Sequence, residues 1–571
     1  MSLKDLEELT SNAKQIQDDV LKEILTLNAN TEYLHRFLHG SSDKELFKKN
    51  VPVVSYDDVK SYIERTANGG EPSDVISGKP ITGFFLSSGT SGGKQKIFPI
   101  NNKFFEDMTF IFALRSQIIF RHIKDVQEGK AITFFFVKPQ STTPSGLPVS
   151  NMLTGFLMSD YFKNRPSNRF TSPDEVTLCQ ENKQAMYCHL LCGLVQRDEV
   201  VSLAAAFASS LVGAITFLEN YWKEMCSNIR SGHVSEWISD LSCRDSVSII
   251  LGGPNSELAE LIEEECKKKS WKGIITRLWP KTKFIQTVVT GQNAQYIPIL
   301  EFYSNKLPLI STAYGSSETI FGVNVNPLCK PEDVSYTFMP TMSYFEFLLA
   351  DEGNNGEIVD LVNVKLGSYY EPLVTNYSGL HRYRMGDILQ VTGFYNSAPQ
   401  FRFVHRKSAV LSVSVEMTTE EDILKALNHA KLVLKPSHLI LMGFTCYADI
   451  STHPAHYVFY WELKATNIND TVKLDEKMLV DCCCVMEESF CSLYREFRKK
   501  NGSIGALEIR VVAQGTFDSL MEFFISQGAS VSQYKTPICI NSSEALAVLE
   551  KSVIAHFFSD KSPPVGSKIQ Y

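Results

Sequence analysis

The alternation of apolar and polar positions along the chain predicts a mixed α/β protein. Apolar residues recur with helical spacing through Leu3–Leu38 and Phe104–Ile123, which indicates amphipathic helices. The almost continuously apolar stretches Ile81–Leu86, Ala131–Lys138 and Tyr344–Leu349 are typical of buried strands. Further elements are expected at Ser55–Arg65 (a helix) and at Phe284–Thr290, Pro308–Ala313 and Phe394–Val415 (short strands). No internal repeat appears, which favours a layered α/β fold over a repeat array.

One uncharged stretch, Val200–Leu218, has nearly the length of a membrane span. It is rich in Ala, Ser and Gly, and its flanks, Arg197–Glu199 and Glu219, show no basic bias. We therefore expect one or two buried helices over Met186–Leu218, inside a large α/β domain. Small residues on such a helix would leave room beside it for a ligand.

A compact α+β pattern begins near residue 420 and predicts a separate C-terminal domain. Thr418 and Glu421 fit a capping box in front of the amphipathic run Ile423–Leu434. The elements expected beyond this run are strands at Tyr457–Leu463 and Ala506–Val512 and a helix at Phe517–Gln527. The predicted divisions of the chain are residues 1–412, a hinge at 413–422, and residues 423–571.

Composition narrows the range of functions. A chain of 571 residues with 44% hydrophobic residues can bury a full core, and its net charge of −8 argues against a nucleic-acid binder. The start, Met1–Glu8, lacks the apolar region of a secretory signal. The 13 cysteines contain no paired CxxC motif, and the run Cys482–Cys484 would point in different directions on a helix. We therefore expect no zinc site, reduced thiols and a cytoplasmic protein.

The most informative segment is Ser87–Lys96, which reads SSGTSGGKQK and follows a predicted strand. Three glycines and four hydroxyl residues in its first seven positions can aim backbone N–H groups and hydroxyls at phosphate oxygens. The segment differs from a Walker A loop at Ser88 and Gln95. The same letters also fit a flexible Gly-Ser turn between two strands.

Two later motifs suit other parts of a nucleotide. Thr312–Glu318, TAYGSSE, sets hydroxyls, backbone N–H groups and one carboxylate in a turn, and a carboxylate beside a phosphate implies Mg²⁺. Tyr383–Asp387, YRMGD, ends in a carboxylate that suits two ribose hydroxyls. The alternatives are a helix start with Glu318 in its first turn, and a hairpin whose Asp387 faces solvent.

A fourth motif, Gln533–Pro537 or QYKTP, lies in the predicted C-terminal domain. Pro537 biases Thr536 toward extended backbone, so we expect Lys535 on a stiff loop rather than on a helix. An ordinary solvated lysine fits the same pattern.

In this order, the four motifs resemble those of the adenylate-forming superfamily of acyl-CoA synthetases and luciferases. The chain is similar to the plant acyl acid amido synthetases, which conjugate auxin, jasmonate or benzoates to amino acids. The strings that carry the resemblance are SSGTSGGKQK, YCHLLCGLVQRDEV, YGSSE, SYFEF, YRMGD, GFYNSAPQFRF, GTFDSLMEFF and QYKTP. The resemblance implies a large N-terminal domain with β-sheets, helices and a β-barrel-like part, followed by a small mobile α+β domain.

The resemblance also implies a role for each motif residue. The set that it places around ATP is Ser87, Ser88, Thr90, Thr312, Tyr314, Gly315, Ser316, Ser317, Glu318, Tyr344, Phe345 and Asp387. Within this set, Ser87, Ser88 and Thr90 would contact the phosphates of ATP. The TAYGSSE motif would hold the α-phosphate, with Glu318 on Mg²⁺. The rings of Tyr344 and Phe345 would flank the adenine, and Asp387 would bind the ribose. Lys535 and Glu318 are the implied catalytic residues, and Lys535 arrives with the mobile domain. One site would then serve two steps, formation of an acyl-adenylate and its attack by an amino acid.

One residue of the predicted helix Phe104–Ile123 gives information about the acyl substrate. Arg115 falls inside an apolar stripe, whose members are Met108, Ile111, Phe112, Ile118 and Ile119. A buried guanidinium needs an anion, which either a protein carboxylate or a carboxylate of the ligand can supply. Auxin-type members of the family have apolar residues here, so Arg115 resembles the benzoate-type branch, which includes the enzyme that couples isochorismate to glutamate. The implied substrate-binding residues are Phe112, Arg115, Ala206, Thr290 and Thr154.

We therefore expect a ligase that uses ATP and Mg²⁺ to couple a small cyclic or aromatic acid to an amino acid, in plant hormone or defence metabolism. The expected partners are these two substrates, without nucleic acid or membrane, and the expected state is a monomer. An adenylate-forming acyl-CoA ligase and a catalytically silent protein that binds a hormone acid remain as rival classes. The chain departs from the family pattern at Ala455, Ile538, Gln292, Asn293 and Leu153–Gly155, which bears on the choice of amino acid more than on the activity.

Overall fold

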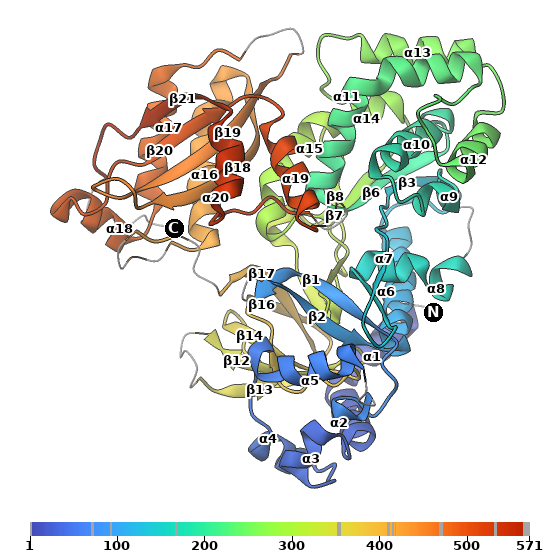
Figure 1. Ribbon diagram of the computed structural model, residues 1–571, viewed down its shortest axis with the longest axis vertical. Helices are drawn as coiled ribbons and strands as arrows, with labels where there is room; N and C mark the ends of the chain where they lie inside the picture. Colours follow the sequence, from blue (N-terminus) through green and yellow to red (C-terminus); the bar gives the residue numbers. More distant parts are fainter. Residues whose placement is uncertain are drawn as a thin grey trace.

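The computed structural model describes residues 3–69, 73–91, 94–165, 169–350, 356–407, 411–413, 416, 418–467, 472–529, 531 and 534–563; for 73, 88–91, 94, 500 and 501 it describes the backbone alone. Across these residues helices alternate with four sheets (Figure 1). The mixed α/β class predicted from the sequence is confirmed.

The N-terminal helices pack against a large, mainly antiparallel sheet at the bottom of Figure 1. The helices are α1 (Leu3–Ser11), α2 (Ala13–Asn28), α3 (Glu32–Leu38), α4 (Lys44–Asn50), α5 (Tyr56–Asn68) and η1 (Ser73–Val75). The strands are β9 (Ala313–Gly315), β10 (Ile320–Val323), β11 (Tyr336–Phe338), β12 (Tyr344–Leu349), β13 (Ile358–Asp360), β14 (Tyr369–Thr375), β15 (Tyr383–Arg384), β16 (Asp387–Tyr395) and β17 (Ala398–Arg406), with η4 (Pro331–Asp333) and η6 (Leu361–Asn363) between them. This sheet is the counterpart of the predicted barrel-like part, and its described strands pair along an open path that ends at β13 and β9.

The hairpin β16–β17 links the N-terminal helices to the middle of the chain. Its two-residue turn is held by α1, because Asn396 Nδ2 donates to Glu7 Oε2 at 2.9 Å and Ser397 Oγ donates to the Thr10 carbonyl oxygen at 2.6 Å. At the other end of the hairpin, Asp387 stands opposite Arg406.

The segment Ser87–Lys96 lies in a small sheet of order β2-β1-β5-β4. Its strands are β1 (Gly83–Ser91), β2 (Lys94–Ile100), β4 (Ser141–Thr142) and β5 (Pro148–Ser150). The described backbone of the predicted phosphate loop is therefore the tip of a hairpin, as in the alternative of a turn between two strands, and residues 92 and 93 lie outside the described part. Helix α6 (Asn102–His122) follows, and its Phe104 ring packs on Phe85 of β1 at a centroid distance of 5.0 Å.

A parallel sheet, β3-β6-β7-β8, carries the rest of the large N-terminal part. Its strands are β3 (Lys130–Phe134), β6 (Val200–Phe207), β7 (Phe284–Val288) and β8 (Leu309–Ile310). The helices packed around it are α7 (Met152–Met158), α8 (Asp160–Lys163), α9 (Asp174–Thr177), α10 (Asn182–Val195), α11 (Ala208–Ser231), α12 (Leu241–Leu251), α13 (Ser256–Cys266), α14 (Ile274–Leu278), α15 (Ile297–Ser304) and η3 (Gly291–Tyr296). Across the described chain, none of the helices combines the length and the apolar character that crossing a bilayer requires.

The expected helix over Val200–Leu218 is wrong for its first eight residues, which form strand β6. A strand between two parallel neighbours is buried on both faces, so it loses the apolar–polar alternation of a half-exposed strand. Periodicity alone does not separate such a strand from a buried helix. Only the second half of the stretch is helical, as the start of α11.

The C-terminal part is a four-stranded sheet covered on both faces. The strands are β18 (Leu439–Asp449), β19 (His456–Ala465), β20 (Glu508–Val512) and β21 (Val553–Phe558), and the helices are α16 (Glu420–Leu434), η7 (Lys435–Ser437), α17 (Glu476–Ser489), α18 (Ser492–Glu496), η8 (Phe497–Asn501), α19 (Thr516–Ser526) and α20 (Ser543–Glu550). Side chains alternate along β19, so that Phe459 and Trp461 pack with α16 and α17 while Val458 and Tyr460 pack with α19 and α20. The helices and strands predicted for this part are confirmed.

The capping box of α16 is shifted by one residue from the predicted one. Thr419 and Asp422 form it, whereas Thr418 shares a hydrogen bond with Tyr457 Oη at 3.0 Å. Both Thr418 and Thr419 are followed three residues later by an acidic residue, so the pattern alone could not choose between them. Within the predicted hinge 413–422, residues 414, 415 and 417 lie outside the described part, and the domain boundaries stay a prediction.

Candidate functional site

The carboxyl ends of the parallel strands bring together predicted residues from distant parts of the chain. Ala206 and Phe207 end β6, Thr290 follows β7, and Thr312 follows β8. Thr312 is buried, whereas the other three are partly exposed. In open α/β sheets, ligands bind at this edge, so the topology favours a site here.

The TAYGSSE motif forms strand β9 and a tight turn that leads into β10. In the turn, Ser316 N donates to the Thr319 carbonyl oxygen at 2.8 Å, and Ser316 Oγ accepts from Glu318 N at 3.2 Å. Ser317 Oγ donates to the Leu86 carbonyl oxygen of β1 at 3.3 Å. The turn therefore adjoins the predicted phosphate loop, and a strand rather than a helix follows it.

The carboxyl group of Glu318 fits a magnesium ion. Burial raises its pKa, while a hydrogen bond with Ser316 and the charge of Arg406 lower it. Its backbone is fixed by Asn376, whose Nδ2 donates to the Glu318 carbonyl oxygen at 2.8 Å. Within the described chain, Glu318 forms no ion pair. A desolvated carboxylate without its own cation suits Mg²⁺, which takes one or two carboxylates and fills its other positions with phosphate oxygens and water.

Asp387 is buried at the start of β16 and is held from two sides. Tyr314 Oη donates to Asp387 Oδ2 at 2.5 Å, and Arg406 Nε donates to Oδ1 at 3.0 Å. The Tyr314 ring is itself fixed by stacking on Phe321 and Tyr336, at centroid distances of 4.4 and 5.7 Å. The alternative of a solvent-facing Asp387 is therefore wrong. Its two oxygens keep lone pairs free to accept from a further hydroxyl.

Lys535 reaches the same place from the C-terminal part of the chain. Its Nζ lies 4.5 Å from the centroid of the Phe207 ring. Burial lowers the pKa of Lys535 to about 8; Arg406 lowers it further, and the carboxylates of Asp387 and Glu420 raise it. Two cations and two carboxylates thus converge where the C-terminal part meets the rest of the molecule.

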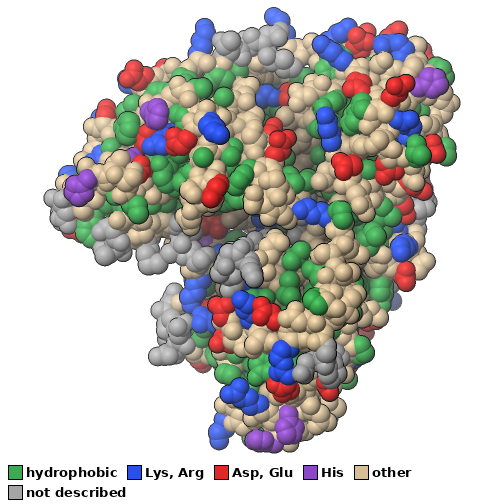
Figure 2. Space-filling model, in the orientation of Figure 1, with side chains coloured by type: hydrophobic (Ala, Val, Ile, Leu, Met, Phe, Trp, Pro, Cys, Tyr) green, Lys and Arg blue, Asp and Glu red, His purple; other side chains and the backbone are tan. Residues whose placement is uncertain are grey.

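The loop that carries Lys535 is held by the N-terminal part. Ser209 Oγ donates to the Tyr534 carbonyl oxygen at 3.2 Å, and Tyr296 Oη shares a hydrogen bond with Thr536 Oγ1 at 3.1 Å. Residues 534–537 are neither helix nor strand, as the sequence predicted. In Figure 2 the surface is hollowed beneath the C-terminal part, at this junction.

Arg115 lies on α6, and no carboxylate of the described residues forms an ion pair with it. Its guanidinium sits 4.0 Å from the centroid of the Phe112 ring, and burial lowers its pKa to about 10. It forms no ion pair within the described residues, so the alternative in which a protein acid neutralises it finds no support there. Because an unpaired buried charge is costly, a ligand carboxylate is the fitting partner.

Three residues of the predicted site are buried, and their contacts with ligands stay predictions. Tyr344 is 1% exposed and donates its hydroxyl to Asp360 Oδ1 at 2.8 Å, and Phe345 is 0% exposed in an aromatic cluster. Thr154 is also 0% exposed, and its hydroxyl accepts from Lys138 N at 3.3 Å. Strand β12 is covered on both faces, which the short pattern SYFEF does not reveal.

The side chains of Ser88 and Thr90 lie outside the described part, and Ser87 beside them is half-buried, so their contacts with phosphate stay predictions. Two residues of the site were missed, Arg406 and Glu420. Arg406 could have been found, because a two-residue turn after Tyr395 aligns it with Asp387 across the hairpin. Glu420 gave no such signal, since an acidic residue is ordinary at a helix start.

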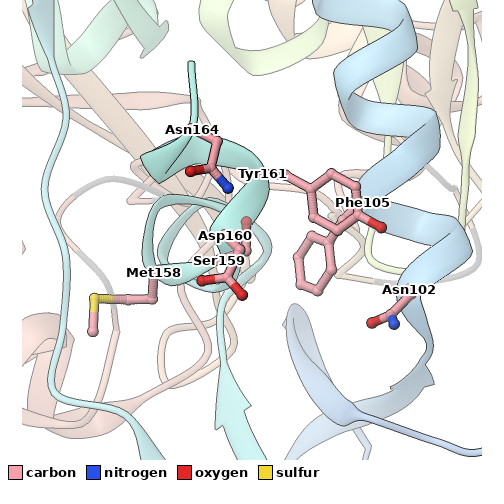
Figure 3. Close-up of a pocket in the computed structure, with 7 residues that line it drawn as sticks. All are labelled: Asn102, Phe105, Met158, Ser159, Asp160, Tyr161 and Asn164. Carbon is pink, nitrogen blue, oxygen red and sulfur yellow. The ribbon is translucent and has the colours of Figure 1, made fainter. Parts of the chain in front are cut away.

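Figure 3 shows a separate surface cavity of about 660 Å³ between α6 and α8. It is lined by Asn102, Phe105, Met158, Ser159, Asp160, Tyr161 and Asn164, none of which belongs to the predicted site. A second cavity of about 20 Å³ touches Glu318 and reaches Lys103 and Asp107 of α6. The hollow in Figure 3 is therefore distinct from the junction around Lys535.

Comparisons with known proteins agree with the arrangement of these motifs. The profiles of the GH3 family N-terminal, central and C-terminal domains match residues 2–309, 336–406 and 421–544. A 4-substituted benzoates-glutamate ligase of Arabidopsis thaliana, GH3.12, is 61% identical over 563 residues, covering 97% of this chain and 98% of the ligase. The acyl acid amido synthetase AtGH3.15 in complex with 2,4-DB, 51% identical, matches with a TM-score of 0.93 over 99% of this chain and 98% of that one. A 2-hydroxyisobutyryl-CoA ligase in the postadenylation state, 11% identical, shares the fold with a TM-score of 0.50 over 94% and 91% of the chains.

Proposed function

The chain belongs to the GH3 family of plant acyl acid amido synthetases, and on that premise we propose that it activates a small cyclic or aromatic carboxylic acid with ATP and couples it to an amino acid. A benzoate or an isochorismate-like acid is the proposed acyl substrate, in plant hormone or defence metabolism. The enzyme would act as a monomer in the cytoplasm, with its two small substrates as its partners and without nucleic acid or membrane.

Arg115 carries the choice of acid. Its guanidinium is desolvated and has no protein carboxylate beside it among the described residues, so it can hold a ligand carboxylate in a two-pronged fork. Phe112 offers a ring next to the guanidinium, and the small side chain of Ala206 leaves space at the end of β6. A guanidinium beside an aromatic ring suits a benzoate better than a bulky apolar acid. The similarity to a benzoates-glutamate ligase supports the same class.

In the first step, the substrate carboxylate would attack the α-phosphorus of ATP, and pyrophosphate would leave. The turn Thr312–Glu318 would hold the α-phosphate through its N–H groups and hydroxyls, and Lys535 would stabilise the charge that develops on the phosphate oxygens. Asp387 would accept hydrogen bonds from the ribose. Glu318 would hold Mg²⁺, which would supply neutralising charge.

In the second step, the amine of the amino acid would attack the acyl carbonyl carbon, and AMP would leave. The C-terminal part would rotate about residues 413–422 between the steps and withdraw Lys535. This rotation must break the hydrogen bonds that join Ser209 to Tyr534 and Tyr296 to Thr536. It must also break other polar contacts between the two parts, such as the Lys464–Glu219 ion pair and the hydrogen bond from Lys431 Nζ to the Gln295 carbonyl oxygen.

The test compares the acid specificity of the wild type and Arg115→Leu by exchange of labelled pyrophosphate into ATP. Arg115→Leu should weaken binding of the favoured acid by about 2–5 kcal/mol, the scale of a desolvated charge pair that loses one partner. ATP dependence should stay unchanged. Arg121→Leu, which changes an exposed arginine on the same helix, is the matched control and should leave the acid profile unchanged.

An unaltered acid profile in Arg115→Leu would remove the substrate class from this proposal. Adding amino acids or coenzyme A to the same assay, with mass spectrometry of the products, separates an amido synthetase from an acyl-CoA ligase. A protein that binds the acid without any exchange would be the silent hormone-acid binder.

A further inference from the structure

Two thiols of the C-terminal part face each other beside the loop of Lys535. Cys446 lies on β18, and Cys539 lies four residues after Lys535. Their Sγ atoms are 3.1 Å apart, and both cysteines are free thiols.

The backbone fixes this pair in register. Cys446 N donates to the Ile538 carbonyl oxygen at 2.8 Å, and Ile540 N donates to the Cys446 carbonyl oxygen at 2.9 Å. Cys446 and Cys539 are therefore partners in a parallel β-bridge. Neighbouring strands lie about 4.7–4.9 Å apart, which falls inside the Cα spacing that disulfides accept, about 4.4–6.8 Å. A sulfur–sulfur bond of about 2.0 Å then requires an approach of only about 1 Å between the two thiols.

We propose that hydrogen peroxide converts Cys446 and Cys539 into a disulfide, and that this bond slows the adenylation step by displacing the loop of Lys535. Cys539 is partly exposed and Cys446 is buried, so the oxidant reaches Cys539 first. The Cys539 thiolate attacks a peroxide oxygen, the O–O bond breaks, and a sulfenic acid and one water form. Cys446 then attacks that sulfur, the S–O bond breaks, and its proton leaves in a second water. Two thiols and one hydrogen peroxide thus give one disulfide and two waters.

The link to Lys535 runs through a short, anchored segment. Thr445 Oγ1 donates to the Pro537 carbonyl oxygen at 2.7 Å, and Cys446 Sγ donates to the Ile538 carbonyl oxygen at 3.1 Å. Oxidation removes that S–H donor and pulls Cys539 toward β18. A misplacement of about 1 Å at a catalytic group can cost on the order of 100-fold in rate. We expect adenylation by the oxidised protein to slow by at least about tenfold, while transfer from a preformed acyl-adenylate changes less.

The test treats the wild-type protein with hydrogen peroxide and maps its peptides by mass spectrometry under non-reducing conditions, alongside pyrophosphate exchange. The wild type should show the Cys446–Cys539 cross-link and a loss of exchange that dithiothreitol reverses. Cys446→Ser should keep its exchange activity in peroxide and be fully active under reducing conditions. Cys243→Ser is the matched control, because Cys243 hydrogen-bonds Cys179 in the N-terminal part, and it should respond as the wild type does.

A peptide map without the cross-link, at peroxide levels that oxidise free glutathione, would overturn the disulfide. A cross-link with unchanged exchange would overturn its control over Lys535, and so would equal inactivation of Cys446→Ser. Cys539→Ser serves as the second variant if Cys446→Ser does not fold. The measurement of pyrophosphate exchange depends on the proposed function, whereas the peptide map does not. If no acid supports exchange, the proposed function fails while the map still decides on the disulfide.

Discussion

Removing the charge of Lys535 should separate the two steps of the proposed reaction. Lys535→Met keeps an unbranched apolar side chain against Phe207 and takes away the ammonium. Pyrophosphate exchange should fall by at least about 100-fold, the scale of losing one group that stabilises a developing charge. Amide formation from a presynthesised acyl-adenylate should fall much less, because the proposed role of Lys535 is to stabilise charge on the phosphate oxygens during adenylation and not to act on the amine.

The buried charge of Lys535 should also lower the free energy of unfolding, which can be measured separately from activity. Burial lowers the pKa of Lys535 from 10.5 to about 8, so the protonated form costs the unliganded protein roughly 3 kcal/mol, at about 1.4 kcal/mol for each pH unit. Because the folded pKa lies below the unfolded one, the full cost applies below pH 8 and shrinks as the pH rises toward 10.5. Lys535→Met should therefore unfold at higher urea concentration than the wild type at pH 7, and this gain should fade above pH 8.

The same pKa predicts a pH profile for the wild type. Exchange should decline as the pH rises past about 8, where the free amine loses its proton. Bound ATP adds negative charge and moves this decline to higher pH. In Lys535→Met the decline should be absent.

Lys431→Met is the matched control. Lys431 also lies in the C-terminal part, and burial lowers its pKa to about 8, but its Nζ donates to the Gln295 carbonyl oxygen at 3.2 Å and not to the ATP motifs. This variant should keep both steps. Equal loss of both steps in Lys535→Met, or the same selective loss in Lys431→Met, would refute the assigned role.

Two further substitutions test the ribose site and the charge network of the C-terminal sheet. Asp387→Ala should raise the ATP concentration needed for half-maximal exchange, because a charge-assisted hydrogen bond of roughly 1.5–3 kcal/mol is lost; unchanged ATP dependence would show that Asp387 does not hold the ribose. Glu508→Gln should lower the free energy of unfolding at neutral pH. Burial raises the pKa of Glu508, but hydrogen bonds from His456, Arg510 and His556 outweigh burial and bring it to about 2. Its contribution is therefore complete above the unfolded value and is lost as the pH falls toward 2. Urea unfolding of both proteins between pH 7 and 3 measures this, and a difference that does not change with pH would contradict it.

Local patterns in the sequence predicted the positions of helices and strands better than they predicted which side chains are exposed. Strand β12 has the predicted bounds, Tyr344–Leu349, because a short apolar run between polar residues has few other solutions. Its inaccessibility depends on a segment far away in the chain, since Phe345 N donates to Gln17 Oε1 of α2 at 2.8 Å. No pattern around residue 345 contains that information.

The separate motifs likewise could not predict which charged side chains lie together around Lys535. Asp387 and Lys535 were both predicted, but Arg406 and Glu420, which set the charge around them, were not. Arg115 was recognised from its place in an apolar stripe. Whether an internal acid paired with it could be decided only from the structure, because a carboxylate from any part of the chain could have reached it.

The hydrogen bonds from the turn of β16–β17 to α1 connect the first helix to the proposed ribose site. Glu7 and Thr10 hold one end of a strand pair whose other end presents Asp387 and Arg406. Paired strands are connected by hydrogen bonds along their length, so a turn that is released at one end loosens the carboxylate at the other. A chain that starts after Ser11 should therefore keep its sheets but bind ATP more weakly, which titration with ATP would measure. A fusion tag placed directly before α1 should weaken ATP binding in the same way if it displaces this helix.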